Sequence, residues 1–467
     1  MSINSFDDYP LSWRPDKRNL KRPFYLSLIK YMKNDIEAGN LLPGTKLPPQ
    51  RELADFLDIS FSTVTRAYKL SQDLGITYGI IGKGTYISQS AGRNTTITRN
   101  DIKSVKELGF ISSFETNNSL LQPEIIASAK QTQISKLLNY DAPTGLPKHK
   151  LIAIKYLKKI GVKSNLDNLV ITSGGENALV IALMGLFRSG DKIAVDQFTY
   201  ANFIELAKLL NIKLVPIKSD GEGMSDKHLL QMCQSQVING IYLMPDACNP
   251  TTKSISSKRR IELAKVIRAY RLIVIEDDYL SFLNLYREKP LEKISNLVPN
   301  QSVYICSMSK LLASGLRVAF MCTSQEFRSK IENAMFNISV KTSALDVDIV
   351  VRSLEDGVAE KIMNQKVKMA IEANRLFDKI FNLDNEYENQ EKMLFFRFLP
   401  LQSTEKGEVL EKWFLRKGIR VFHSDRFLVG EGEGNSFLRI SLASNNSLDD
   451  LNTGLLHLKR LLSEFEN

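Results

Sequence analysis

ICSMSKLLASGLRVAF (residues 305–320) places a single lysine, Lys310, between an apolar strand-like run and a turn that contains glycine. Four similar runs precede it: NLVITSG (168–174), KIAVD (192–196), GIYLMP (240–245) and LIVIED (272–277). Helical segments separate these runs, a pattern typical of an α/β domain with a largely parallel sheet. Because ligands of such domains bind at the carboxyl ends of the strands, Lys310 is expected to face a ligand site.

Outward from this stretch, the 467 residues divide into three regions. Residues 1–88 show short helical patterns, and the polar residues 89–110 predict a linker. Residues 111–467 contain the α/β domain, whose pattern changes at about residue 350 to a long helix followed by strands. We therefore expect a multidomain chain with a mostly α-helical N-terminal domain and an α/β domain that ends in a small α+β subdomain.

Composition limits the class of protein. Hydrophobic residues at 43% and charged residues at 24% are normal for a globular protein, and the net charge of +10 hints at an anionic partner. No apolar run approaches the ~18 residues of a membrane helix, and MSINSFDDYP at the start is not a signal peptide. The four cysteines lack a C-x-x-C pair, which argues against structural zinc. We expect a cytoplasmic protein with no metal site and no membrane partner.

The stretch PPQRELADFLDISFSTVTRAYKLSQDLG (48–75) predicts two helices joined by a tight turn through residues 58–60. Ser60 is a natural N-cap for the second helix. This cap leaves polar side chains near the exposed N-terminal turns, where they can meet phosphates and base edges in a DNA major groove. These side chains are Ser62, Thr63, Thr65 and Arg66. A three-helix packing module without DNA contact is the alternative.

The hairpin YGIIGKGTYIS (78–88) predicts a wing after these helices, with Gly82, Lys83 and Gly84 at its turn. Residues 36–88 resemble the winged helix-turn-helix domain of the GntR family through G-x-L-x-P-G-x-x-L-P, R-E-L-A, S-T-V-x-R-A-Y and G-x-G-T. The resemblance implies binding to double-stranded promoter DNA. The contacts that it implies are Arg51, Ser62, Thr63 and the wing glycines. One departure is Phe61, which stands where members commonly have a basic residue.

A lysine amine in a cleft can form a Schiff base with an aldehyde cofactor, and pyridoxal phosphate (PLP) needs a recognisable set of partners. The glycine turn of TSGGENAL (172–179) can bind phosphate through backbone N–H groups, with a helix dipole behind them. Asn249 can offer its amide to a phenolate oxygen, and Tyr279 can reach the same oxygen. Asp277, at the end of LIVIED, can hold a pyridinium nitrogen protonated.

Each of these signals is weak alone. A lysine at a strand end is more often solvated, a D-D pair can bind magnesium, and Asn-Pro is often only a turn. Their conjunction at the ends of the predicted strands predicts a PLP site. Together the motifs resemble the fold-type I aminotransferase family over roughly residues 111–465.

That resemblance implies a complete set of site residues. The cofactor-binding residues that it implies are Lys310, Asp277, Tyr279, Asn249, Tyr200, Gly174, Gly175, Glu176, Ser307, Ser309 and Arg317. Tyr200 is expected to stack on the cofactor, and Arg439 in FLRISLA is expected to hold the carboxylate of an amino-acid ligand, with a surface salt bridge as the alternative for Arg439. Glu176 departs from the family, which usually has glutamine there, and its carboxylate opposes a phosphate dianion.

A GntR domain and an aminotransferase-like domain on one chain is the architecture of the MocR-type regulators. The resemblance implies a homodimeric DNA-binding transcriptional regulator in which Lys310 holds PLP as an aldimine. Such a regulator senses an amino compound or PLP itself. Two alternatives stay open: a catalytically active aminotransferase with an accessory DNA-binding module, and a regulator whose site has lost the cofactor.

Overall fold

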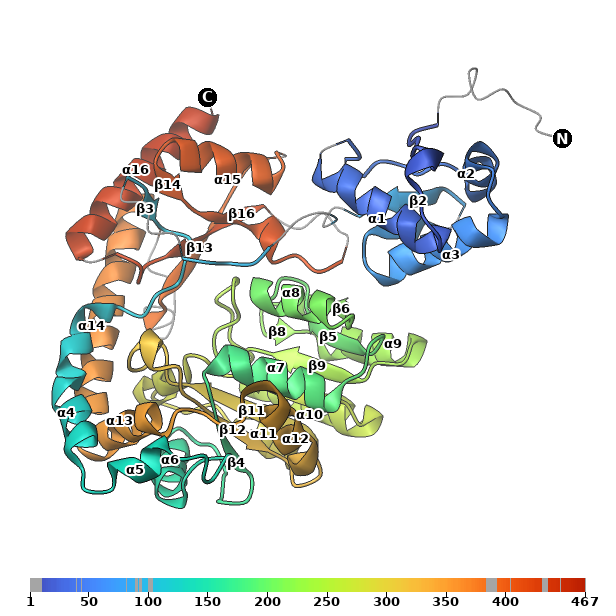
Figure 1. Cartoon of the computed structure of the whole chain (residues 1–467). Coiled ribbons are helices and arrows are strands. Elements are labelled where there is room, and N and C mark those ends of the chain that lie inside the picture. The colour runs from blue at the N-terminus through green and yellow to red at the C-terminus, as the bar shows by residue number, and fades with distance from the viewer. Residues whose placement is uncertain are drawn as a thin grey trace. The chain divides into compact units, whose positions relative to one another are not determined.

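The chain divides into two compact units, Met1–Thr95 and Thr96–Asn467 (Figure 1). From Thr96 onward the predicted linker belongs to the second unit, and the predicted boundaries at 88 and 110 remain proposals. Among the described residues, no helix is long and apolar enough to cross a membrane. The computed structural model describes residues 11–38, 40–42, 44–80, 82–88, 91, 95–99, 104–383, 393–403, 405–430, 436–445 and 447–466.

The first unit contains the predicted winged helix-turn-helix. Its helices are α1 (Phe24–Glu37), α2 (Gln50–Leu57) and α3 (Phe61–Asp73), and its hairpin pairs β1 (Thr77–Ile80) with β2 (Gly84–Ile87). The turn between α2 and α3 passes through Asp58, whose φ of 47° is left-handed. Ser60 then caps α3, because its Oγ accepts a hydrogen bond of 3.3 Å from the N–H of Thr63. The fold expected for this part of the chain is confirmed.

The second unit is built on a seven-stranded sheet. In spatial order its strands are β4 (Leu169–Thr172), β12 (Ala319–Thr323), β11 (Ser302–Ser307), β10 (Ile273–Asp277), β9 (Gly240–Leu243), β5 (Lys192–Asp196) and β6 (Lys213–Ile217). Strand β12 runs antiparallel to both of its neighbours, and the other pairs are parallel. The carboxyl ends of β4, β5, β9, β10 and β11 therefore share one edge, as a largely parallel sheet predicts.

Helices cover both faces of this sheet. One face packs against α7 (Gly175–Leu186), α8 (Ala201–Leu209) and α12 (Arg328–Ser339), and the other against α9 (Asp226–Ser235), α10 (Ser257–Tyr270) and α11 (Ile294–Leu297). Neighbouring residues of one strand serve opposite faces: Tyr242 on β9 belongs to the first core, and Ile241 to the second. Burial on both faces explains why these strands are continuous apolar runs.

The remaining elements form the flank of the sheet and a small subdomain. The flanking helices are α4 (Gln122–Lys130), α5 (Ile134–Leu138), α6 (Pro147–Lys159) and α13 (Ala344–Glu355). A short hairpin pairs two strands of two residues each, β7 (Ser219–Asp220) and β8 (Gly223–Met224). The long helix α14 (Val358–Phe381), orange in Figure 1, packs beside α16 (Leu448–Glu466). The subdomain sheet has the order β13 (Phe396–Pro400), β16 (Phe437–Ser441) and β15 (Phe422–His423). Around it lie α15 (Gly407–Arg416) and the parallel pair of β3 (Lys106–Glu107) with β14 (Ile419–Arg420).

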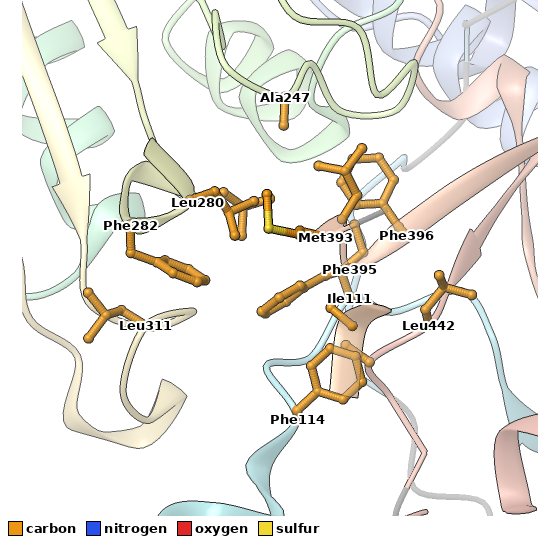
Figure 2. Packing of buried hydrophobic residues seen from close by; sticks show 14 of the residues in the cluster. Ile111, Phe114, Ala247, Leu280, Phe282, Leu311, Met393, Phe395, Phe396 and Leu442 are labelled. Atoms are coloured by element: carbon orange, nitrogen blue, oxygen red, sulfur yellow. The ribbon is translucent and has the colours of Figure 1, made fainter. Parts of the chain in front are cut away.

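One apolar core joins the small subdomain to the rest of the second unit. Figure 2 shows Phe395, from the start of the subdomain, pointing between Phe114 and Phe282. Its ring centroid lies 4.9 Å from that of Phe114, in an edge-to-face arrangement, and 5.9 Å from that of Phe282. Ile111 lies in the same core. The segment around residues 111–114 is therefore fixed against both parts of the unit, next to the carboxyl edge of the sheet.

Candidate functional site

The candidate DNA interface of the first unit lies at the start of α3. The Oγ of Ser60 lies 3.0 Å from Ser62 Oγ and 2.7 Å from Thr63 Oγ1. Arg51, on α2, holds its guanidinium 5.7 Å from the ring centroid of Phe61. Three of the predicted DNA contacts, Arg51, Ser62 and Thr63, are thus brought to the same end of the helix that is expected to enter the groove.

The other two residues predicted on α3 have partners within the unit. Thr65 Oγ1 donates a hydrogen bond of 2.8 Å to Gln50 Oε1 on α2. The guanidinium of Arg66 lies 3.9 Å from the ring centroid of Tyr25 on α1. These contacts tie α3 to the two other helices, so both side chains have a structural role beside any contact with DNA.

The wing turn joins β1 to β2. Gly82 and Gly84 have φ angles of 75° and 118°, which residues with side chains rarely adopt. A Cβ on Gly84 would also lie 2.9 Å from Cε of Lys46. Lys83 is exposed between the two glycines, so the turn presents a cation at its tip. Contact of these residues with DNA stays a prediction.

A cavity of about 390 Å³ opens at the carboxyl edge of the seven-stranded sheet. Its lining brings together residues from five strand ends and from the small subdomain. The predicted cofactor and ligand residues in this lining are Gly175, Glu176, Tyr200, Asn249, Asp277, Tyr279, Ser307, Ser309, Lys310, Arg317 and Arg439. Gly174 is the one predicted residue outside it, and Gly174 directly precedes Gly175 in the same turn.

Lys310 lies three residues beyond β11, and its partly buried side chain lines the cavity. Its Nζ donates a hydrogen bond to the carbonyl of Ile111. Burial lowers the pKa of the amine to about 8; the cations of Arg439 and Arg317 act in the same direction, and Glu115 acts against them. Because the free amine is the form that attacks a carbonyl, this environment prepares Lys310 for a covalent bond to an aldehyde.

Asp277 ends β10 and is buried. Its Oδ2 accepts a hydrogen bond of 2.9 Å from Tyr242 Oη, and the ring of Tyr242 stacks on Phe203. Burial raises the pKa of Asp277 to about 7; Glu176 and Asp278 act in the same direction, while the Tyr242 hydrogen bond opposes them. A neighbouring cation favours the ionised carboxylate, so Asp277 suits a protonated ring nitrogen.

The glycine turn after β4 forms the predicted phosphate end of the cavity. Gly174 has a φ of 90°, which residues with side chains rarely adopt, and a Cβ there would lie 2.6 Å from Nη2 of Arg317 and displace that side chain. Arg317 also donates a hydrogen bond of 3.1 Å to Ser309 Oγ. The N-cap Gly174 provides no side-chain cap for α7, so backbone N–H groups and the helix dipole are available to an anion there.

Glu176 lies in the first turn of α7, beside this phosphate end. Its Oε1 accepts a hydrogen bond from Tyr200 Oη. Burial raises the pKa of Tyr200 well above its ordinary value, with Glu176 as the next cause, so the phenol stays a neutral donor. The ring expected to stack on a cofactor is therefore also the partner of the carboxylate that departs from the family pattern.

Arg439 reaches the cavity from β16, the middle strand of the subdomain sheet. Its guanidinium donates to Asn249 Oδ1 at 2.9 Å and to the carbonyl of Gly109 at 2.5 Å. Its buried Nε has no hydrogen-bond partner among the residues that the structure describes. Burial lowers the pKa of Arg439 to about 10, so it remains cationic at neutral pH. Because Arg439 is 1% exposed, the alternative of a surface salt bridge is wrong. The Nε without a partner leaves a donor for a carboxylate.

Two further predicted residues flank this arginine. Tyr279 Oη donates a hydrogen bond of 2.8 Å to the carbonyl of Ala247. The Oδ1 of Asn249 accepts from Arg439, which leaves the amide N–H₂ of Asn249 as its donor side. Both side chains thus place polar atoms on the cavity wall, close to the strand ends predicted to hold them.

Sequence reasoning did not identify Lys366. This residue of α14 is fully buried, and its Nζ donates to the carbonyls of Lys310 at 3.2 Å and Leu312 at 2.5 Å. Burial lowers the pKa of Lys366 to about 7, and the charge of Lys310 acts in the same direction. A lysine on an amphipathic helix is normally solvated, so the sequence offers no signal that Lys366 is buried and bonded to the backbone around Lys310.

Part of the predicted linker also lines the cavity. Ile97 and Arg99 belong to its wall. Asn202, on α8, accepts a hydrogen bond of 2.7 Å from the N–H of Ile97 and donates one of 3.5 Å to its carbonyl. Arg99 lies 3.5 Å from Glu115, which in turn accepts from Ser314 Oγ.

These observations match what PLP requires. Lys310 offers an amine of lowered pKa, Asp277 offers a buried carboxyl for a ring nitrogen, and the glycine turn with Arg317 offers donors for a phosphate. The open Nε of Arg439 adds a place for a carboxylate. The donor set therefore fits the cofactor together with an amino-acid ligand.

The sequence models of two families match the chain. The model of "Bacterial regulatory proteins, gntR family" matches residues 24–87, which span α1 to β2. The model of "Aminotransferase class I and II" matches residues 112–454, which span the seven-stranded sheet and most of the small subdomain. The two matches fall on the two units of the structure.

Whole proteins are similar as well. The HTH-type transcriptional regulator YdeF of Bacillus subtilis (strain 168) is 32% identical over 99% of this chain and 100% of its own length. The vitamin B6 salvage pathway transcriptional repressor PtsJ of Salmonella typhimurium (strain LT2) is 27% identical over 70% of this chain and 73% of its own. The crystal structure of LysN, an α-aminoadipate aminotransferase of Thermus thermophilus, is 21% identical with a TM-score of 0.69, over 81% of this chain and 97% of that one, and shows the same fold. The chain belongs to the GntR family of HTH-type transcriptional regulators and has the MocR-type architecture, in which the DNA-binding domain is followed by an aminotransferase class I and II domain.

Proposed function

We propose that this DNA-binding regulator binds PLP at Lys310 and senses an amino compound, or PLP itself, in the cavity. One observation carries the proposal: the side chains expected to take the cofactor and the ligand also hold the segment that leads to the DNA-binding unit. Lys310 donates to the carbonyl of Ile111, and Arg439 donates to that of Gly109. The sensing groups are therefore bonded to backbone near the N-terminal end of the second unit, which directly follows the DNA-binding unit in the chain.

Ligand binding would compete with these contacts. Attachment of a cofactor at Nζ removes donor hydrogens from Lys310, and a ligand carboxylate competes with the carbonyl of Gly109 for Arg439. Each event weakens a contact to residues 109–111, while Asn202 still holds the backbone of Ile97 further upstream. Ligand-dependent states of this segment are what a switch needs in order to bias DNA binding.

The arrangement of the site assigns separate functions to the cofactor and to the residues of the protein. PLP, when bound, supplies an aldehyde and a ring that withdraws electrons. Asp277 holds a proton at the ring nitrogen, the glycine turn and Arg317 bind the phosphate, and Arg439 orients the carboxylate of an amino compound. Two similar proteins support the assignment: PtsJ is a repressor of a vitamin B6 salvage pathway, and the LysN structure, which has the same fold, is a complex with N-(5'-phosphopyridoxyl)-L-leucine.

The direct test measures how tightly the full chain binds a duplex selected in vitro, without ligand, with PLP, and with PLP plus candidate amines. Because allosteric coupling is typically about 1–3 kcal/mol, the Kd for DNA is expected to change at least about fivefold on ligand binding. Lys310→Ala is expected to bind DNA with one Kd under all conditions. Lys330→Ala, which removes an exposed lysine of α12, should respond like the wild type. A Lys310→Ala protein that responds like the wild type would rule out the switch.

The proposal also includes a homodimer that acts at a promoter in the cytoplasm, as the MocR-type architecture leads us to expect. Sedimentation of the full chain, with and without the selected duplex, tests the dimer. A monomer bound to a single half-site would contradict this part of the proposal and leave ligand binding in the cavity unaffected.

A working aminotransferase is the second candidate, because Lys310, Asp277 and Arg439 together are what that chemistry uses. Turnover of an amino donor and a keto acid at about 1 s⁻¹ or faster would favour the enzyme. Slow or absent turnover, with DNA binding that is specific and weakens with salt, would favour the regulator.

Glu176→Gln is expected to bind PLP about tenfold more tightly than the wild type. The substitution removes a negative charge beside the phosphate end, and a charge pair across a partly solvated gap contributes about 1–2 kcal/mol. Glutamine keeps an oxygen that can accept from Tyr200 Oη. Equilibrium titration with PLP measures the change, and Glu262→Gln, at a half-buried residue of α10 outside the cavity lining, is the control. An unchanged or weaker affinity in Glu176→Gln would show that Glu176 does not oppose the phosphate.

A further inference from the structure

Phe61 is the first residue of α3 and is 48% exposed. The buried core residues of α3 are Val64, Ala67 and Tyr68, and Leu70 packs against this core, whereas Phe61 stands outside it. A half-exposed phenylalanine contributes less free energy to folding than a buried one, because much of its apolar surface stays in water. Packing within the unit therefore does not account for an aromatic ring at this place.

The surroundings of Phe61 are polar and ordered. Ser62 and Thr63, the next two residues, have their hydroxyls bonded to the capping Ser60. The guanidinium of Arg51 lies over the Phe61 ring, which restricts where its remaining donors point. The start of α3 thus presents a large apolar group beside a positioned cation.

In a helix-turn-helix, this end of the second helix contacts base edges in the major groove. Thymine alone carries a methyl group there, and an apolar side chain such as phenylalanine recognises it by contact. We propose that Phe61 contacts the 5-methyl group of a thymine in the operator and thereby fixes the base preference at that position. Arg51, whose guanidinium lies over the ring, is placed to donate to the neighbouring base or phosphate. This inference rests on DNA binding through α3.

The test uses the full chain and an operator selected from a random duplex library. Each thymine is replaced singly by deoxyuracil, which keeps the base-pairing groups and removes only the methyl. At one thymine in each half-site, the replacement is expected to weaken binding by the wild type about fourfold, the effect of one buried methyl group. Phe61→Ala is expected to bind the thymine and deoxyuracil duplexes equally.

Two variants sharpen the result. Leu74→Ala removes a large apolar side chain, 36% exposed, from the opposite end of α3, and it should keep the wild-type sensitivity to deoxyuracil. Phe61→Arg is expected to select guanine at the same position, because arginine pairs with guanine in the major groove. Circular dichroism and the thermal midpoint establish that each variant is folded.

The outcomes separate this inference from DNA binding itself. The role of Phe61 would be overturned if no thymine-to-deoxyuracil replacement weakened binding by the wild type. It would also be overturned if Phe61→Ala lost as much affinity as the wild type on that replacement. If the folded wild type selects no duplex at all, DNA binding through α3 fails, and the inference fails with it.

Discussion

Lys310→Ala is expected to remain colourless with PLP and to carry no pyridoxyl group after borohydride treatment. The wild type should show a yellow band that borohydride converts into a stable modification of residue 310. Lys366 is a demanding internal control, because its pKa is also lowered, but its Nζ is bonded to the carbonyls of Lys310 and Leu312. Peptide mass spectrometry should therefore find the modification on residue 310 and not on residue 366.

The rate of attachment should depend on pH in a defined direction. Burial disfavours the charged amine and lowers the pKa of Lys310 to about 8, so about a tenth of it is neutral at pH 7, against roughly 0.03% for an ordinary lysine. Only the neutral amine attacks the aldehyde, and the rate should rise with pH and level off above about 8. Stopped-flow absorbance measures this profile. A rate that still climbs steeply at pH 10 would show that the cavity does not perturb Lys310.

The sheet was predictable because its strands have a strong local signature. The runs at β4, β5, β9, β10 and β11 are apolar on both faces, as burial between two helical layers demands. Strand β12 has a similar composition, but its antiparallel direction depends on pairing with β11 and β4. Such pairing is set by long-range contacts, which the local pattern does not contain.

The site was predictable where its chemistry follows a strand. Asp277 ends one apolar run and Lys310 lies three residues beyond another, so a shared carboxyl edge is enough to bring them together. Arg99 and Lys366 reach the same region through tertiary packing of a polar segment and of a long helix. A polar segment has the same composition whether it is a solvated linker or packs against the wall of a cavity. For this reason the sequence gives no signal that Ile97 and Arg99, within the predicted linker, line the cavity.

A buried cluster of charges supports the residue next to Asp277. Lys293 is fully buried, and its Nζ donates to Asp278 Oδ2 at 2.6 Å and to Asp246. Arg260 also donates to Asp246, at 2.5 Å, and Tyr304 Oη donates to Asp278 at 2.8 Å. Burial alone would lower the pKa of Lys293, but the carboxylates of Asp246 and Asp278 raise it above its ordinary value. Lys293 is therefore protonated at neutral pH.

Lys293→Met is expected to lower the free energy of unfolding of the second unit by about 3–5 kcal/mol, because it leaves a buried carboxylate without its ammonium partner. Without this cation the pKa of Asp278 should rise further, since burial and the charge of Asp246 already raise it. A carboxyl whose pKa is raised in the folded state is stable when protonated, so stability is lost as the pH rises through that pKa. The penalty in the variant should therefore be larger at pH 8 than at pH 5.

Urea unfolding followed by the fluorescence of Trp413, in a Trp13→Phe background, reports on the second unit. Lys265→Met is the matched control: Lys265 is 62% exposed and pairs with Glu262 three residues before it on α10, so its loss should cost less than about 1 kcal/mol. Equal midpoints for Lys293→Met and Lys265→Met would contradict the prediction, because they would show that neither Asp246 nor Asp278 depends on the buried ammonium.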